Sequence, residues 1–118
     1  MRTATDQAAN PQQMYQEKRL IEQAQAGDHQ AFEDLIFKYD RHILGLTLRL
    51  LGSRDEAKAA YQETFLKVFR SLGQFQPQSS FYTWILRIAT NVCFNRLRQK
   101  QVRNEVLHDR ISRALNTL

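Results

Sequence analysis

A chain of 118 residues with 42% apolar residues is long enough for one domain with a modest core, and it is too apolar for a disordered protein. No apolar run approaches the roughly 18 residues that span a bilayer, and the N-terminus lacks the apolar stretch of a secretion signal, so we expect a cytoplasmic protein without membrane insertion. The net charge of +5 is unevenly distributed along the chain. The residues up to Asp40 include four basic and seven acidic ones, a net charge of −3. Residues 41–83 include six basic and three acidic ones (+3), and the residues from Trp84 onward include seven basic and two acidic ones (+5).

The basic excess lies in the C-terminal part of the chain. A phosphate backbone is the obvious partner for such an excess, although a solvated basic helix face is its commoner cause. The chain has only four glycines and two prolines, no alternating strand pattern of useful length, and many residues with high helix propensity. We therefore expect an all-α fold, a compact bundle of about four helices.

The N-terminal region combines a polar segment with a first short helix. Residues 1–12 contain an Asn-Pro pair and no periodic apolar face, so we expect a flexible leader. A helix is predicted from about Gln13 to Ala26, ended by Gly27. The domain itself is predicted to span residues 13–100. The apolar positions that can line one side of this helix are Met14, Leu20, Ile21 and Ala24.

The second predicted helix begins at Asp28, whose carboxylate can cap it, and stops at Gly52. Its apolar residues recur at three- and four-residue steps over about five turns. Gly45 lies inside this helix, either at a close helix contact or incidentally. The periodic apolar positions are Phe32, Leu35, Ile36, Tyr39, Ile43, Leu46 and Leu50.

A third helix opens at Ser53-Arg54-Asp55-Glu56, which has the form of a capping box. It is expected to end near Gly73, and a loop follows over residues 74–79. This loop carries one exposed-looking aromatic residue, Phe75, which either contacts a ligand or tucks under its own loop. The predicted buried side of the helix consists of Ala57, Tyr61, Phe65, Val68 and Leu72.

The fourth predicted helix begins after Ser79 and Ser80, where a hydroxyl can accept a first-turn N–H. Its polar side carries Arg87, Asn91 and Asn95, and together with its aromatic residues this side indicates a helix that faces nucleic acid. The apolar stripe on the other side consists of Phe81, Trp84, Ile85, Ile88, Val92 and Cys93. The single cysteine of the chain therefore falls on the buried face, where a free thiol behaves as a small hydrophobe.

A strongly basic run over residues 96–103 continues the fourth helix. Residues 101–118, which overlap the end of this run, are either a C-terminal helix or the start of a linker. The histidines do not cluster at metal-ligand spacing, and no phosphate loop, nucleophile motif or paired-carboxylate site is apparent. We therefore expect a protein that is not an enzyme and needs no cofactor or metal.

Three blocks of sequence resemble region 2 of a bacterial RNA polymerase sigma factor of the extracytoplasmic-function (ECF) group. They are residues 27–32 together with Tyr39, residues 61–70 and residues 81–91. Each block alone is weakly specific, but three in this order and spacing are strongly so. The resemblance covers roughly Leu20 to Lys100 and implies the sigma region 2 fold.

The resemblance also implies partners and site residues. The second and third helices would bind the β′ clamp helices of core RNA polymerase, while the loop and fourth helix would melt the minus-ten promoter element and capture a flipped base of its non-template strand. An anti-sigma factor is a further implied partner. The implied polymerase-binding residues are Gln62, Glu63 and Phe65. The implied DNA-binding residues are Phe75, Ser79, Ser80, Phe81, Trp84, Leu86, Arg87 and Asn91, with Arg96, Arg98 and Lys100 near phosphates.

Chemistry supports these roles, but ordinary structural explanations remain beside them. Aromatic faces stack on unpaired bases at roughly 1 to 3 kcal/mol per base, and an amide can read a base edge. Phe81 and Trp84 nevertheless lie on the apolar stripe, so each is equally well explained as core. Gln62 and Glu63 could equally be solvated helix residues without the resemblance.

The chain also departs from the family pattern. Residues 58–61 stand where the family usually has acidic residues and an aliphatic one ahead of Gln62, and Gln76 and Gln78 stand where the loop often carries an arginine and an acidic residue. Nothing after Leu97 resembles the helix-turn-helix of region 4, so the chain is either an excised region 2 domain or a natural single-domain relative. Two alternatives therefore stay open: a sigma-mimicking regulator that binds an anti-sigma factor or polymerase without opening DNA, and a generic basic duplex-binding domain.

Overall fold

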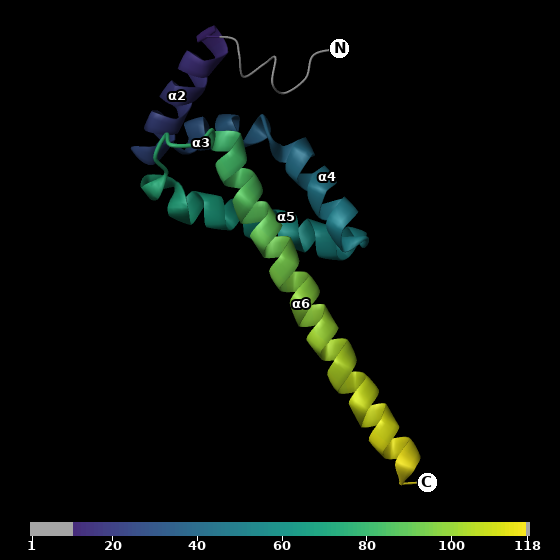
Figure 1. The fold of residues 1–118 in the computed structure, drawn as a ribbon. Coiled ribbons are helices and arrows are strands. Elements are labelled where there is room, and N and C mark those ends of the chain that lie inside the picture. Colours follow the sequence, from purple (N-terminus) through teal and green to yellow (C-terminus); the bar gives the residue numbers. More distant parts are fainter. Residues whose placement is uncertain (1–10, 118) are drawn as a thin grey trace.

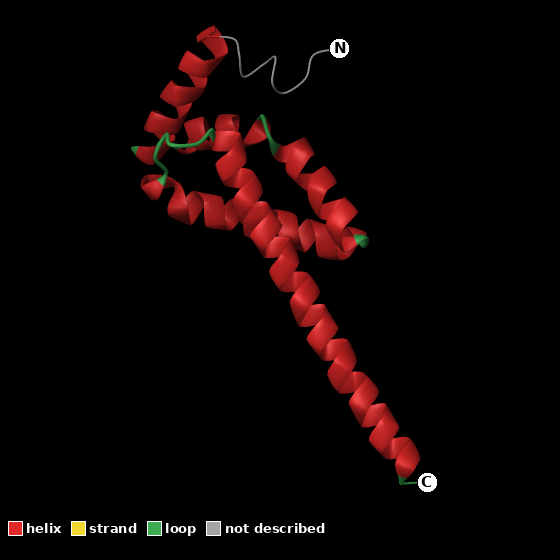
Figure 2. Ribbon diagram, in the orientation of Figure 1, coloured by secondary structure: helices red, strands yellow, loops and turns green. Residues whose placement is uncertain are grey.

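The computed structural model describes residues 11–117, and in this part of the chain every regular element is a helix (Figure 2). The all-α fold predicted from composition is therefore confirmed. The flexible leader expected over residues 1–12 lies outside the described residues apart from Pro11 and Gln12, which begin the first helix. The elements are α2 (Pro11–Gln25), α3 (His29–Phe37), α4 (Asp40–Leu51), α5 (Arg54–Ser71), the 3-10 helix η1 (Leu72–Gln74) and α6 (Phe81–Asn116) (Figure 1).

The helix ends follow the local signals in the sequence. Asp28, Ser53 and Ser80 each accept a hydrogen bond from the backbone N–H three residues along, at 3.1, 3.4 and 3.1 Å. These bonds satisfy first-turn donors that would otherwise lack a partner. Gly27 and Gly52 have φ of +102° and +72°, a left-handed backbone that ends α2 and α4 at little steric cost. The predicted starts of the third and fourth helices are thereby confirmed.

The single helix predicted between Asp28 and Gly52 is wrong, because the chain breaks it into α3 and α4 at Lys38 and Tyr39. The N–H groups of these two residues bond to carbonyls three positions earlier, at 3.3 and 2.9 Å. The Tyr39 ring stacks on Tyr82 of α6 with the ring centroids 5.5 Å apart. Packing across the fold therefore holds a turn that no local breaker encodes, and α4 runs in a different direction from α3 (Figure 1).

The core lies between α6 and the helices that surround its first half. Gly45 is not at a close contact, because a Cβ built there would meet no atom within 4 Å. Cys93 is fully buried as predicted, and this burial raises the pKa of its thiol. The main buried cluster consists of Leu35, Ile43, Val68, Leu72, Phe75, Phe81, Ile85 and Ala89, and a smaller one of Leu51, Ala60, Val92 and Cys93.

The last helix is far longer than the domain body requires. α6 runs for 36 residues without a break, which corresponds to about 54 Å, and its second half leaves the body of the molecule (Figure 1). Residues 101–116 are thus helical. Val102, Leu107, Ile111 and Leu115 in this half are each at least 50% exposed. Within residues 11–117, none of the helices is long and apolar enough to cross a bilayer.

Candidate nucleic-acid interface

Three aromatic residues form a cluster where the loop meets α6. The ring centroid of Phe75 lies 5.3 Å from that of Phe81 and 5.0 Å from that of Trp84, and Phe81 and Trp84 are 5.6 Å apart. Of the two alternatives for Phe75, the structure supports a ring tucked under its own loop, because only 9% of the residue is exposed. Phe81 is likewise buried and Trp84 half-buried. The cluster therefore anchors the loop to α6 through apolar packing.

Gln25 fastens the end of α2 to the base of the same loop. Its side-chain Nε2 donates to the carbonyl oxygens of Leu72 at 3.0 Å and Phe75 at 3.2 Å. These bonds join positions 47 and 50 residues apart. The sequence interpretation missed Gln25, because nothing in the local pattern distinguishes this glutamine from the others in α2.

The tip of the loop presents polar side chains to solvent. Gln76, Gln78 and Ser80 are exposed, and Ser79 is partly so. The Gln78 amide donates to the Gln76 side-chain oxygen at 3.4 Å, and the Ser80 hydroxyl donates to the Thr83 hydroxyl at 2.8 Å. The loop thus offers amides and hydroxyls above a buried aromatic base.

An exposed row on the first half of α6, here called the outer stripe, consists of Arg87, Asn91, Phe94 and Arg98. All four residues are exposed, and their steps of four, three and four place them on the helix side opposite the core. The exposure predicted for Arg87 and Asn91 is confirmed. The Arg98 guanidinium donates to the neighbouring Asn95 side-chain oxygen. Phe94 was missed by the sequence interpretation, although its position on a polar helix face is a usable signal.

Not all expected DNA-facing residues lie on this stripe. Leu86 is half-buried and packs against the main core cluster. Arg96 and Lys100 project toward α5 and pair with its acidic residues. Arg96 donates to Glu63 Oε1 from Nη2 at 2.9 Å and from Nε at 3.2 Å, while Lys100 Nζ lies 3.7 Å from Glu56 Oε1. These pairs partly neutralise both cations on the side of α6 that faces α5.

The stretch of sequence that carries the outer stripe has an excess of positive charge, which Glu63 and Glu56 of α5 offset at Arg96 and Lys100. Between Glu63 and Glu105 the sequence contains seven basic residues and no acidic one. Arg87 and Arg98 are exposed, and they form no ion pair with any of the described acidic residues. Such a surface creates a positive local potential that favours a polyanion.

The three residues expected to bind polymerase have different surroundings on α5. Gln62 is exposed, whereas Phe65 is half-buried in a T-shaped contact with Tyr61, with the ring centroids 4.8 Å apart. Glu63 faces α6, where it pairs with Arg96 as described above. Two residues that the sequence interpretation missed, Leu66 and Phe69, are each 47% exposed on the side of Gln62. The sequence pattern that could have identified Leu66 and Phe69 is their spacing of four and seven residues from Gln62, which places all three on one side of the helix.

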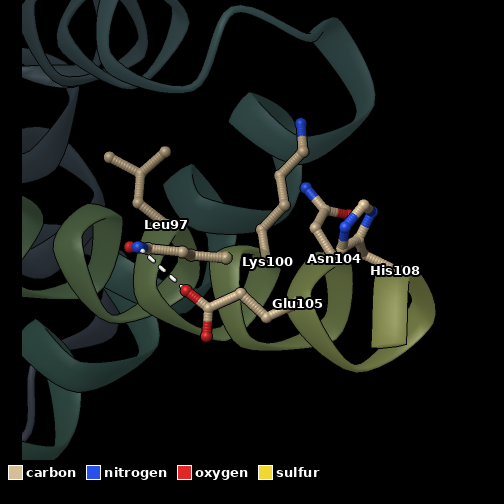
Figure 3. A pocket seen from close by; sticks show the side chains of 6 residues that line it. Leu97, Lys100, Asn104, Glu105 and His108 are labelled. Atoms are coloured by element: carbon tan, nitrogen blue, oxygen red, sulfur yellow. Dashed lines mark hydrogen bonds between the residues drawn. The ribbon is translucent and has the colours of Figure 1, made fainter. Parts of the chain in front are cut away.

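A hollow lies on α6 where the helix leaves the body (Figure 3). It is lined by consecutive turns of this one helix, with Leu97 and Lys100 at one end and His108 at the other. Gln101 donates to Glu105 at 3.3 Å across it. Among the described residues, no group of three or more histidine, cysteine or acidic side chains could hold a metal ion. An open side of a single helix does not enclose a small ligand.

Comparison with known sequences finds sigma factors. Residues 35–103 match the family described as Sigma-70 region 2. The chain is 45% identical over 82 residues to the RNA polymerase sigma-H factor of Pseudomonas aeruginosa, a match that covers 70% of this chain and 42% of that protein. It is 37% identical over 84 residues to the ECF RNA polymerase sigma factor SigW of Bacillus subtilis, covering 71% and 45% of the two chains. The chain thus spans less than half the length of these curated relatives.

Comparison with solved structures finds the same region. The NMR structure of a complex formed by an engineered region 2 of sigmaE with GTAAAA aligns with a TM-score of 0.68 and 34% sequence identity. The alignment covers 74% of this chain and 90% of the other. It agrees with the fold predicted from the three sequence blocks.

Proposed function

Since the chain belongs to the sigma-70 region 2 family, with ECF sigma factors among its relatives, we propose that it recognises promoters by binding core RNA polymerase and single-stranded minus-ten DNA. The observation that carries the proposal is the outer stripe, where the exposed cations Arg87 and Arg98 flank the amide of Asn91 beside a polar loop. In this function the domain performs no chemistry, and catalysis belongs to the polymerase.

On the DNA side, the loop and the outer stripe divide the work. The loop tip from Gln76 to Ser80 offers amide and hydroxyl groups that can bond to a flipped base. Asn91 can read a base edge, and the exposed guanidinium groups of Arg87 and Arg98 can contact phosphates. Phe75, Phe81 and Trp84 support the loop from below, and Trp84 is the member of this cluster with an exposed part. The domain therefore captures non-template single strand with a preformed surface.

On the polymerase side, we assign the contact to the exposed face of α5. Gln62 sits beside the apolar side chains of Leu66 and Phe69, and this mixture suits an apolar contact with a polar rim against the β′ clamp helices. Leu66→Ala should weaken binding to core polymerase at least fivefold. Leu44→Ala on α4, where the leucine is also exposed, is the matched control and should bind as the unmodified chain does.

A fluorescence-anisotropy titration with labelled single-stranded GTAAAA and its single-base variants tests the DNA side. The chain should prefer at least one base at one or more positions, and Asn91→Ala should weaken this discrimination more than Arg98→Ala, because an amide reads a base edge and a phosphate contact does not. Arg98→Ala should instead reduce the slope of log affinity against log salt by about 0.7. Indifference to sequence at every position would contradict the proposal.

A sigma-mimicking regulator is the second candidate, and the ion pairs of Arg96 and Lys100 with α5 favour it because they partly neutralise two cations that DNA would contact. That candidate predicts polymerase or anti-sigma binding without strand opening. Permanganate oxidation of unpaired thymines on a promoter with core polymerase distinguishes the two. Reactive thymines that depend on Asn91 support promoter opening, whereas polymerase binding without reactive thymines supports the regulator.

A further inference from the structure

Phe94 is an exposed aromatic residue in the middle of a polar helix face. It is 49% exposed, although phenylalanine on a helix of this size normally packs into the core. Its helical position is opposite Val92 and Ile85, which are fully buried. None of the described aromatic rings stacks on it. Core packing therefore does not explain this residue.

The surroundings of Phe94 indicate what its ring would contact. Asn91 precedes it by three residues and Arg98 follows by four, so the two flank it on adjacent turns. The nearest acidic residue along α6 is Glu105, three turns away. A flat apolar ring between an amide and a guanidinium group is the combination that binds an unpaired base together with its phosphate. A partner with negative charge and exposed ring faces fits this site, and a basic protein surface does not.

The distance from the loop separates Phe94 from the segment captured there. Phe94 lies thirteen residues after Phe81, which corresponds to about 20 Å along the helix axis. A strand held by the loop at the start of α6 must continue past its captured base to reach this ring.

We propose that Phe94 is a stacking platform for an unpaired base outside the segment that the loop holds, forming a second single-strand subsite on α6. This inference rests on the proposed function, because it assumes that single-stranded DNA lies along the outer stripe. It adds a contact to which neither the sequence pattern nor the resemblance assigns a role.

Probe length tests the subsite. Labelled GTAAAA is compared with two longer strands that carry six additional thymidines on the 5′ or the 3′ side. Phe94→Leu should weaken binding of one extended strand by about 5- to 150-fold and leave GTAAAA itself within twofold. Phe94→Trp should keep the affinity of the unmodified chain, because the indole also stacks. When 2-aminopurine replaces one base of the added segment in that extended strand, the unmodified chain should quench its fluorescence and Phe94→Leu should not.

Phe37→Leu is the matched control, since Phe37 is 77% exposed on α3 and away from the outer stripe, and it should bind all three probes as the unmodified chain does. Equal affinity of Phe94→Leu and the unmodified chain for both extended strands overturns the inference. An equal loss on GTAAAA and on the extended strands also overturns it, because the ring would then act on the segment at the loop. If the unmodified chain binds none of the probes, the proposed function fails first, and that result is distinguishable from failure at Phe94 alone.

Discussion

Replacing Arg96 by glutamine should destabilise the fold, because this arginine ties α6 to α5. Its Nη2 and Nε both donate to Glu63 Oε1, at 2.9 and 3.2 Å, and the two side chains are 33% and 34% exposed. The second oxygen of Glu63 lies 3.5 Å from Lys67 Nζ, so the carboxylate joins two cations. Loss of Arg96 leaves the half-buried Glu63 carboxylate with only its 3.5 Å contact to Lys67.

The size of the effect follows from the geometry. Two unit charges 2.9 Å apart attract by roughly 6 kcal/mol at an effective dielectric constant of 20. Desolvation of the two charges and the loss of side-chain freedom offset most of this attraction. Exposed ion pairs contribute about 0.2 to 1 kcal/mol to stability, and hydrogen bonds to charged groups contribute about 1.5 to 3 kcal/mol. For a pair that is one third exposed we expect a coupling free energy of about 1 kcal/mol. We expect a total loss of about 2 kcal/mol for Arg96→Gln.

A double-mutant cycle measures this coupling. Urea unfolding of the unmodified chain, Arg96→Gln, Glu63→Gln and the double variant gives the four free energies of unfolding, and the coupling should shrink as salt is added. Arg98→Gln is the matched control on the outer stripe and should change the free energy of unfolding by less than about 0.5 kcal/mol. A coupling below about 0.3 kcal/mol would refute the role of Arg96 in joining the two helices.

Three further changes have expected outcomes that the same unfolding measurements check. Gly45→Ala should raise the free energy of unfolding by up to about 1 kcal/mol, because alanine favours the helix and a Cβ meets open space; a lower urea midpoint would contradict this. Ser80→Ala should lower it by about 1 kcal/mol through loss of the α6 cap, and an unchanged midpoint would show that the cap contributes nothing. Burial raises the pKa of the Cys93 thiol, so the thiol ionises at lower pH in the unfolded chain than in the folded one. The contribution of the buried neutral thiol to the free energy of unfolding is therefore complete below about pH 8.5 and is lost as the pH rises through the folded-state pKa. Cys93→Ala should remove this part of the alkaline destabilisation, and native Cys93 should react with a thiol reagent more slowly than in urea.

Features that depend on neighbouring residues were predictable from the sequence. Asp28, Ser53 and Ser80 cap helices through bonds that span only three residues, so a short motif contains all the necessary information. The apolar stripe of α6 was equally visible, because a 3.6-residue period identifies a buried face whatever packs against it. Exposure of Arg87 and Asn91 follows from the same period.

Features that depend on distant residues were not predictable in this way. The break at Tyr39 is held by a ring more than 40 residues away, and neither glycine nor proline marks it. Arg96 looked available for a phosphate until α5 brought Glu63, 33 residues earlier, within 2.9 Å. Phe75 looked exposed because a loop aromatic carries no sign of the rings that cover it. Each of these is a pairing set by the packing of whole helices.

The fastening of the loop at its base has a consequence for how the domain could change during evolution. Phe75 is held by aromatic packing and by Gln25, whereas the side chains of Gln76 and Gln78 at the tip contact each other and not the core. Substitutions at the tip should therefore be nearly neutral for folding, so base preference can drift or be selected without loss of the scaffold. Under the proposed function, the two glutamines are the natural positions to randomise when promoter preference is to be redirected.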